Sequence, residues 1–228
     1  MSSRTIKILS GGAMKSLMAE LVPLFERESG HKAEIEFALT SALTKTIEGG
    51  AAFDVALLPR PDLDALVQAG KIAAGSTADV TRSVVGLCVR AGGPKPDIAT
   101  VDAFKRALMA ARSISYSDGP SGAYIGALLA RLGIADAMKP KTRLTGGPVA
   151  ELVASGEAEI GMQQIVAILP VKGAELVGPL PSELQNVIVY AAGLSGTAQK
   201  SAAAHALIIF MASPDVVRLI RAKGLEPG

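Results

Sequence analysis

The sequence is poor in the residues that catalytic centres and stacking surfaces most often use. It contains one cysteine (Cys88), two histidines (His31 and His205), no tryptophan and only 4% aromatic residues. A disulfide framework is therefore excluded, as are most histidine-based triads and zinc sites. Few side chains remain on which bases or sugars could stack. We interpret Cys88, inside the apolar run VVGLCV, as a buried strand residue, and both histidines as structural or solvated.

Charge of one sign and long apolar runs are missing as well. The 23 Lys and Arg residues nearly balance the 21 Asp and Glu residues, and no basic stripe with interleaved aromatics occurs, so nucleic acid is not an expected partner. No apolar run is long enough to span a membrane, and we expect no membrane insertion. The first residues lack the charged and apolar regions of a leader peptide. The expected location is periplasmic if a leader has been removed, and cytoplasmic otherwise.

Apolar runs and segments of helical period alternate along almost the whole chain. With 228 residues, 49% of them hydrophobic, the chain can form one large domain or two lobes. Gly30 is expected to end the first helix, and Ser213 and Pro214 to start a new helix within the C-terminal helical region. The alternation predicts an α/β fold with mostly parallel, doubly wound sheets. The predicted strands cover residues 5–9, 33–38, 54–58, 84–89, 113–116, 159–163 and 187–191.

The first junction between a strand and a helix has the composition of an anion site. Ser10, Gly11, Gly12 and Ala13 follow the apolar strand and precede Lys15. Glycines allow close backbone approach, and a helix start offers free N–H groups with a partial positive charge. An anion can be held there without a buried counter-charge. The alternative is a tight turn capped by Ser10.

Four more junctions combine small or polar residues with a strand end or a helix start. Each has a structural alternative: the hydroxyls can cap their own helix, and Asp118 can be a cap, a hinge contact or an acid/base group. In an open α/β sheet such turns gather at the carboxyl ends of the strands, where ligands bind. Together they predict a cleft lined by helix N-termini that binds a small anion. The residues are Thr40 and Ser41; Asp118, Ser121 and Gly122; Gly146 and Gly147; and Gln163 and Gln164.

These segments give the chain a resemblance to a known superfamily over nearly its whole length. Among them are IKILSGGAMKSLMAELVPLFERESG, IEFALTSALTKTIEGGAAFDVALLP, SGAYIGALLARLGI and LVASGEAEIGMQQ. The sequence resembles the type II periplasmic-binding-protein superfamily, nearest the molybdate-binding proteins of ABC transporters. The resemblance implies two α/β lobes, each a mostly parallel sheet flanked by helices, with a ligand cleft between the lobes. Lobe 1 is expected to comprise residues 1–82 and 192–228, and lobe 2 residues 83–191.

The residues that hold molybdate in that family are only partly retained. Ala13 stands where the family has a serine, Ser41 matches the second ligand serine, and Gln164 replaces a tyrosine. Lys15 adds a cation that suits a carboxylate. Arg82 is a candidate second cation, or alternatively a member of a surface salt bridge. The changes favour an organic carboxylate over a tetrahedral metal oxyanion.

The leading hypothesis is a solute-binding protein that closes two lobes around a small anion, an organic (poly)carboxylate. We expect a monomer without metal or cofactor, whose partners are the small-molecule anion and, in a transporter, an ABC permease. Hinge closure would follow from ligand binding. The expected ligand-binding residues are Ser10, Gly11, Gly12, Ala13, Lys15, Ser41, Arg82, Ser121, Gly122, Gly147 and Gln164.

A second hypothesis is an enzyme on the same scaffold. Bacterial aconitate isomerases resemble molybdate-binding proteins, and their reaction moves a proton along a carbon chain without a cofactor. The base would be Lys15, if desolvation lowers its pKa, or Asp118. A molybdate-type oxyanion receptor is the third possibility, and a ligand-binding sensor without a transporter is a further one.

Overall fold

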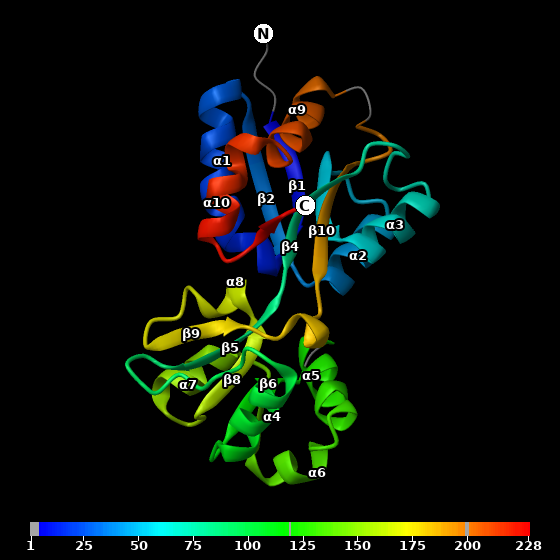
Figure 1. The fold of residues 1–228 in the computed structure, drawn as a ribbon. Coiled ribbons are helices and arrows are strands. Elements are labelled where there is room, and N and C mark those ends of the chain that lie inside the picture. The colour runs from blue at the N-terminus through cyan, green and yellow to red at the C-terminus, as the bar shows by residue number, and fades with distance from the viewer. Residues whose placement is uncertain (1–4, 119, 199–200) are drawn as a thin grey trace. The chain divides into compact units, whose positions relative to one another are not determined.

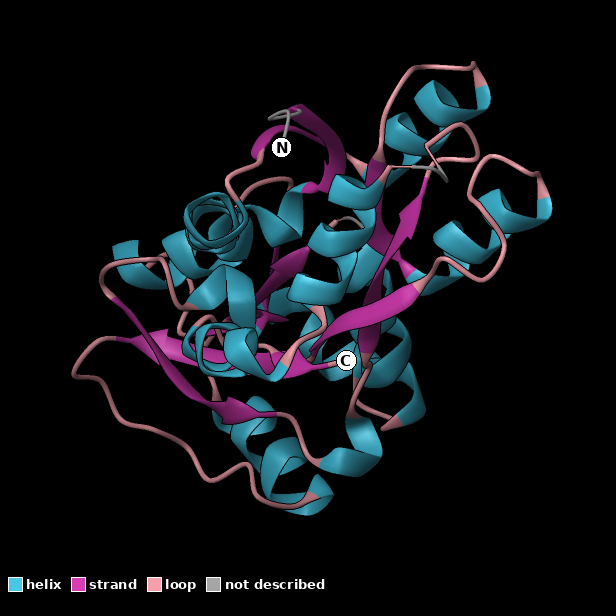
Figure 2. Ribbon diagram, turned by 90° about the horizontal axis from the view of Figure 1, so that it is seen from above, coloured by secondary structure: helices cyan, strands magenta, loops and turns pink. Residues whose placement is uncertain are grey.

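The computed structural model describes residues 5–118, 120–198 and 201–228. The chain divides into two units: Met1–Arg82 with Ile188–Gly228 (unit 1), and Ser83–Val187 (unit 2). Figure 2 distinguishes the helices, strands and loops of both. The sequence expectation placed the second crossing between lobes after residue 191. Residues 188–191 instead belong to unit 1, where β10 (Ile188–Leu194) pairs with β3 (Val55–Pro59) from Tyr190 to Leu194.

Unit 1 contains a sheet with the strand order β11-β4-β10-β3-β1-β2. β1 is parallel to both β2 and β3, β10 is antiparallel to β3, and β11 is antiparallel to β4. The carboxyl ends of β2, β1 and β3 therefore share one edge of the sheet. The remaining elements are β1 (Thr5–Gly11), α1 (Lys15–Ser29), β2 (Lys32–Ala38), α2 (Thr40–Glu48), α3 (Arg60–Gln68), β4 (Ala78–Ser83), α9 (Ala202–Met211), α10 (Val217–Ala222) and β11 (Glu226–Pro227).

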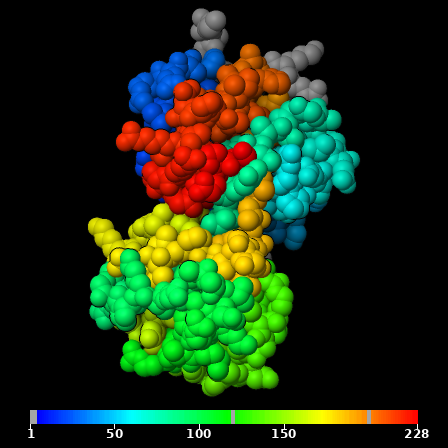
Figure 3. Space-filling view, viewed as in Figure 1, coloured from blue at the N-terminus to red at the C-terminus, as the bar shows by residue number. Residues whose placement is uncertain are grey.

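Helices cover both faces of the unit 1 sheet. Figure 1 shows α1, α9 and α10 on one side and α2 and α3 on the other. On the first side Phe25 of α1 packs against Phe210 of α9, with ring centroids 5.6 Å apart. Lys223, just after α10, forms an ion pair with Glu20 of α1. Both ends of the chain therefore build this unit, and Figure 3 shows the blue N-terminal and red C-terminal parts of its surface.

Unit 2 contains a sheet with the strand order β7-β6-β8-β5-β9. β6 is parallel to β7 and β8, whereas β5 is antiparallel to β8 and β9. The carboxyl ends of β7, β6 and β8 therefore also share one edge. The elements are β5 (Val85–Arg90), α4 (Val101–Ala110), β6 (Ile114–Ser117), α5 (Pro120–Arg131), α6 (Ala135–Met138), β7 (Thr142–Thr145), α7 (Val149–Ser155), β8 (Ile160–Gln164), α8 (Ile165–Ile168) and β9 (Ala174–Pro179).

The unit 2 sheet is also buried on both faces. On one face, the fully buried Phe104 of α4 joins Leu128 of α5 in a cluster with the strand residues Leu87 and Ile114. On the other, residues of α7 and α8 pack around Cys88 of β5. Burying a large apolar side chain contributes roughly 1.5–3 kcal/mol, so these two clusters hold α4, α5, α7 and α8 against the sheet.

The α/β fold class is confirmed, but the sheets are mixed where the sequence predicted mostly parallel ones. Each antiparallel pair includes β4, β5 or β10, the strands next to the crossings between units. Two neighbouring strands that are parallel need a crossover connection within their own sheet. The segments next to β4, β5 and β10 lead into the other unit and provide no such crossover, so these strands can be antiparallel to their neighbours. All seven predicted strands occur, with ends shifted by up to three residues, and β4, β7, β9 and β11 were missed.

The predicted helix ends are confirmed. Gly30 caps α1 with a φ of 73°, and the C-terminal helical region is broken before Pro214. In the part of the chain that the structure describes, no single helix has the length and apolar character to cross a membrane. Ala202–Met211 and Pro214–Ala222 meet that criterion only as a pair bent by 52°.

Gly161 in β8 is expected to tolerate no side chain. A Cβ atom at Gly161 would stand 2.8 Å from Cys88 Sγ and 2.8 Å from Val153 Cγ2. Gly161→Ala should therefore lower the free energy of unfolding by about 1–3 kcal/mol, as overpacking of a core does. Gly178→Ala in β9 is the matched control, because its Cβ would meet only Ile98 Cδ1, at 3.9 Å. Urea denaturation of both variants makes the comparison, and equal stabilities would contradict the packing described.

Cys88 is expected to be unreactive in the folded protein. Burial raises the pKa of its thiol to about 11, and the residue has no exposed surface. Since the thiolate is the reactive species, a thiol reagent at mildly alkaline pH should label the protein only after denaturation. Rapid labelling without denaturant would show that β5 is accessible in the native state.

Candidate functional site

The edge of the unit 1 sheet brings the first two predicted junctions together. Gly11 at the end of β1 pairs in register with Ala38 at the end of β2. A Cβ on Gly11 would lie 3.7 Å from Thr40 Oγ1 and 3.8 Å from Tyr190 Cε1. The glycine thus allows three segments distant in sequence to meet at this edge.

Ser10 does not cap the first helix. It is completely buried, and its hydroxyl donates to the carbonyl of Gly11 at 3.3 Å. The chain enters α1 through a 3-10 turn at Gly12–Met14, and Met14, at the N-cap position, makes no side-chain capping bond. The alternative of a turn capped by Ser10 is therefore wrong. Gly12 is exposed and Ala13 half-buried at the start of this turn.

The second helix also lacks a hydroxyl cap. α2 begins at Thr40, so Thr40 and Ser41 occupy its first turn and Leu39 its N-cap. No side chain caps the helix, and the alternative that one of these hydroxyls does so is wrong. Ser41 is exposed at the sheet edge that also carries Gly11.

Two exposed cations, Lys15 and Arg82, lie at this edge. Lys15, the first residue of α1, is exposed, and neither α1 nor α2 has an acidic residue in its first turn. Arg82 is also exposed, and its neighbour Thr81 donates to Met14 Sδ at 3.6 Å, which places β4 beside the start of α1. Within the described residues, neither Lys15 nor Arg82 forms an ion pair, so the salt-bridge alternative for Arg82 is wrong.

The edge of the unit 2 sheet gathers the other three junctions. Ser117 at the end of β6 shares a hydrogen bond of 3.0 Å with the hydroxyl of Ser121 in α5. A Cβ on Gly122 would come 1.5 Å from the Ser117 carbonyl oxygen, so only glycine fits there. Gly122 therefore serves the close packing of α5 on β6, a role that the sequence analysis did not assign to it.

The turn after β7 lies beside Asp118. The backbone N–H of Asp118 donates to the Thr145 carbonyl at 3.0 Å, and its exposed carboxylate stands 3.5 Å from the position of a Cβ on Gly146. The N–H of Gly147 donates to Thr145 Oγ1 at 3.0 Å. Gly147, an expected ligand-binding residue, thus already donates its N–H to a neighbouring hydroxyl.

Two consecutive glutamines end β8. The half-buried Gln164 accepts from Ser83 Oγ at 3.1 Å, which leaves its NH₂ group as the donor. Gln163 is only 7% exposed, and its Oε1 accepts from the N–H of Val149, the first residue of α7, at 2.9 Å. The sequence analysis placed Gln163 at the junction but not among the ligand-binding residues. Its polarity at a buried strand position was the available signal.

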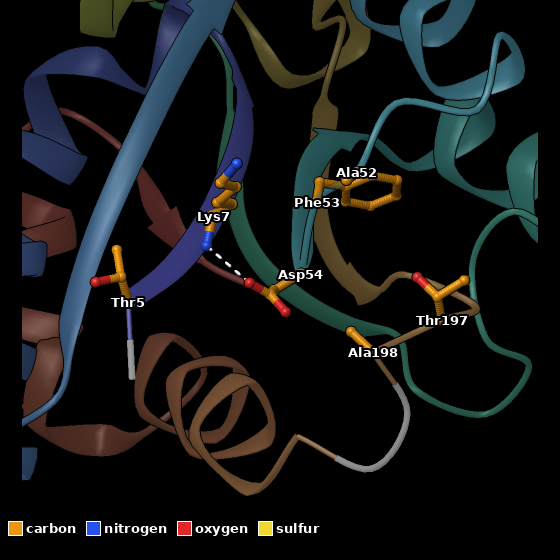
Figure 4. A pocket seen from close by; sticks show the side chains of 7 residues that line it. All are labelled: Thr5, Lys7, Ala52, Phe53, Asp54, Thr197 and Ala198. Carbon is orange, nitrogen blue, oxygen red and sulfur yellow. Dashed lines mark hydrogen bonds between the residues drawn. The ribbon is translucent and has the colours of Figure 1, made fainter. Parts of the chain in front are cut away.

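The cavities inside each unit lie away from these two edges. A cavity of about 290 Å³ opens at the amino ends of β1 and β3, where the N–H of Lys7 donates to Asp54 Oδ2 at 2.9 Å (Figure 4). In unit 2, a groove of about 680 Å³ is lined by Arg90, Arg112 and Arg143 near the amino ends of β6 to β8. None of the predicted ligand-binding residues lines either one.

Relatives along the whole chain include an isomerase and a molybdate receptor. An aconitate isomerase from a Pseudomonas species is 34% identical over 98% of this chain and 88% of its own length. The molybdate-binding protein ModA of Azotobacter vinelandii is 28% identical over 91% of this chain and 84% of its own. The solved structure of the periplasmic molybdate-binding protein of Azotobacter vinelandii superposes with a TM-score of 0.75, covering 98% of this chain and 99% of the other at 19% identity.

A family model agrees with these likenesses over nearly the whole sequence. The model of the bacterial extracellular solute-binding proteins matches residues 6–226. The chain therefore belongs to the family of bacterial extracellular solute-binding proteins and has the two-lobed type II periplasmic-binding-protein fold.

Proposed function

We propose that the protein binds a small organic polycarboxylate, with donors from the sheet edges of both units. The observation that carries the proposal is the pair of uncapped helix starts in unit 1, with no acid in the first turn of either α1 or α2. The starts of three other helices differ. Thr100 caps α4, Ser201 caps α9, and α3 on the same edge has Asp62 in its first turn. The first N–H of α1 bonds the Gly12 carbonyl, so the unused donors lie in the turn Gly12–Met14 that leads into α1 and at the start of α2. These donors and the positive helix dipoles favour a bound anion there.

Lys15 supports the proposal that an anion binds at the start of α1, because its ammonium lies at a helix N-terminus, where a cation is unfavourable when no anion is bound. A cation at a helix N-terminus is repelled by the macrodipole, with a magnitude of roughly 0.3–1 kcal/mol. In the described chain Lys15 has no acidic partner to offset this repulsion. An anion bound at the start of α1 would interact favourably with both the ammonium and the dipole.

The donor set supports a carboxylate more than a tetrahedral metal oxyanion. Ala13 and Gln164 stand where the resemblance to molybdate receptors places a hydroxyl and a phenol, and only Ser41 is retained. An ammonium with several neutral donors suits separate carboxylate groups. Aconitate carries three carboxylates, and the isomerase that acts on it is 34% identical to this chain. Binding of a molybdate-type oxyanion is the weaker alternative.

The family description supports a role outside the cytoplasm. As a solute-binding protein, the chain would bind its anion in the periplasm as a monomer and deliver it to an ABC permease. Ligand binding by both units would then shift the population toward a closed form.

Substitution of Lys15 tests the binding proposal. Isothermal titration calorimetry with trans-aconitate should show that Lys15→Ala weakens binding about 10–100-fold, as expected for a charged hydrogen bond worth about 1.5–3 kcal/mol. Ser41→Ala should weaken binding about 3–10-fold through loss of a neutral bond.

Arg27→Ala is the matched control for charge. Arg27 is exposed in the last turn of α1, at the opposite end of that helix from Lys15, and its removal should leave the affinity unchanged. Equal affinities of Lys15→Ala, Ser41→Ala and the wild type would place the anion elsewhere. Tighter binding of molybdate than of trans-aconitate would favour the oxyanion alternative.

A second candidate function is isomerisation of the bound polycarboxylate, and the 34% identity to an aconitate isomerase favours it. In this reaction a base removes a proton from the methylene carbon, the double bond shifts by one carbon, and a proton is returned to the former vinyl carbon. The helix starts and Lys15 would bind the carboxylates. The exposed Asp118 at the end of β6, or Lys15 itself, would move the proton.

Deuterium incorporation separates binding from catalysis. Incubation of the protein with cis- or trans-aconitate in deuterated water, followed by NMR, should show both isomer formation and label at the methylene carbon if the chain is an isomerase. Asp118→Asn should then abolish the exchange if Asp118 is the base, since an amide cannot accept the proton. Saturable binding by the wild type without label would assign the chain to the receptors.

A further inference from the structure

Gln163 holds a buried amide in one fixed orientation. It lies in β8 with 7% of its surface exposed, and its Oε1 accepts from the backbone N–H of Val149 at 2.9 Å. A backbone N–H can only donate, so the group that faces it must be the amide oxygen. The NH₂ group therefore occupies the other position, and no rotation of the amide exchanges the two without breaking this bond.

The NH₂ group has no partner. Among the described residues, Gln163 Nε2 is buried and makes no hydrogen bond. Leaving a buried donor unsatisfied costs roughly 1–3 kcal/mol, and native proteins rarely tolerate it without a reason. Its neighbour differs, because the Oε1 of Gln164 is bonded to Ser83 and the residue is half-buried.

Gln163 also lies at the ligand-binding edge proposed for unit 2. Gly161 of β8 is in register with Ser115 of β6, so Gln163, two residues further on, is level with Ser117 at the end of β6. Its hydrogen bond ties it to the start of α7, directly after the Gly146–Gly147 turn. Ser117 and Gly147 already use their polar groups within the protein, whereas the Gln163 amide retains a free donor.

We propose that Gln163 is a ligand-binding residue whose NH₂ group donates to an ionised carboxylate oxygen of the bound anion. This inference rests on the proposed function and names a residue and a chemistry within it. The amide offers only donors on its free side, so the ligand must supply an acceptor there. Because the same amide holds the first N–H of α7, a bound carboxylate would polarise the amide and strengthen its hydrogen bond to Val149.

Gln163→Glu tests the donor while keeping the acceptor. One carboxylate oxygen can still accept from Val149, and a negative charge at a helix N-terminus is favourable, so the fold should persist. The other oxygen replaces the donor and repels an anion. Calorimetry with trans-aconitate should show a loss of affinity of at least about 10-fold, the size expected for a hydrogen bond to a charged group.

Two further variants separate the loss of the donor from the added charge. Gln68→Glu introduces the same charge at an exposed position at the end of α3 and should bind like the wild type. Gln163→Met removes the donor, and the acceptor for Val149 with it, without adding a charge, and should also bind weakly. Thermal unfolding of each variant checks that it is folded. Wild-type affinity in Gln163→Met would overturn the inference.

NMR of the wild type provides a test that needs no variant to bind. The chain has five glutamines, so ¹⁵N-glutamine labelling gives few side-chain NH₂ signals, and the signal missing from Gln163→Glu assigns Gln163. Titration with trans-aconitate, citrate and molybdate should shift this signal over the range in which calorimetry detects binding. Calorimetric binding without a shift would overturn the role of Gln163 and leave the proposed function intact. Absence of binding to all three anions would overturn both.

Discussion

The structure depends on one constraint: parallel strands must end at the same edge of a sheet, and a helix that starts there leaves N–H groups without partners. In unit 1 this brings the ends of β1 and β2 together with the starts of α1 and α2. In unit 2 it collects Ser117, Thr145 and Gln164 at the ends of three neighbouring strands. In unit 1 the helix starts keep donors that only an acceptor from outside the helices can satisfy, whereas in unit 2 most donors are bonded within the protein and the Gln163 amide is left over.

Most of the fold could be predicted from local patterns, because buried strands are almost continuously apolar and Gly30 ends α1 with a positive φ. The missed strands lack that signal. β7 and β9 are edge strands without a fully buried residue, and β11 has two residues. Their pairing depends on neighbours distant in sequence. Local sequence patterns could not predict the direction of β5 and β10 either, since that direction follows from where the chain crosses between units.

The composition of the junctions between strands and helices identified the predicted site residues, but it could not predict the role of each residue. Ser10 and Thr40 have the side chains of caps, yet Ser10 is buried in a strand and α2 starts too early for Thr40 to cap it. Gly122 was expected among the ligand-binding residues, whereas the structure gives it a packing role, because the Ser117 carbonyl excludes any side chain at its position. Gln163, in contrast, was not among the expected ligand-binding residues. Its unpaired NH₂ group is evident only from the structure, where the bond to Val149 fixes the orientation of the amide.

The same donors can serve a receptor or an isomerase, and the difference lies in the base. A receptor that only binds the polycarboxylate needs donors for its carboxylates. An isomerase also needs a base within hydrogen-bond reach of the proton on the methylene carbon. Asp118 is an exposed carboxylate at the unit 2 edge, and it would repel a polyanion unless the donors around it dominate. Lys15 avoids that repulsion but is already expected to bind a carboxylate. A carboxylate beside a carboxylate-binding edge is unfavourable for holding an anion and useful for moving a proton, so Asp118 is the feature of this edge that supports catalysis.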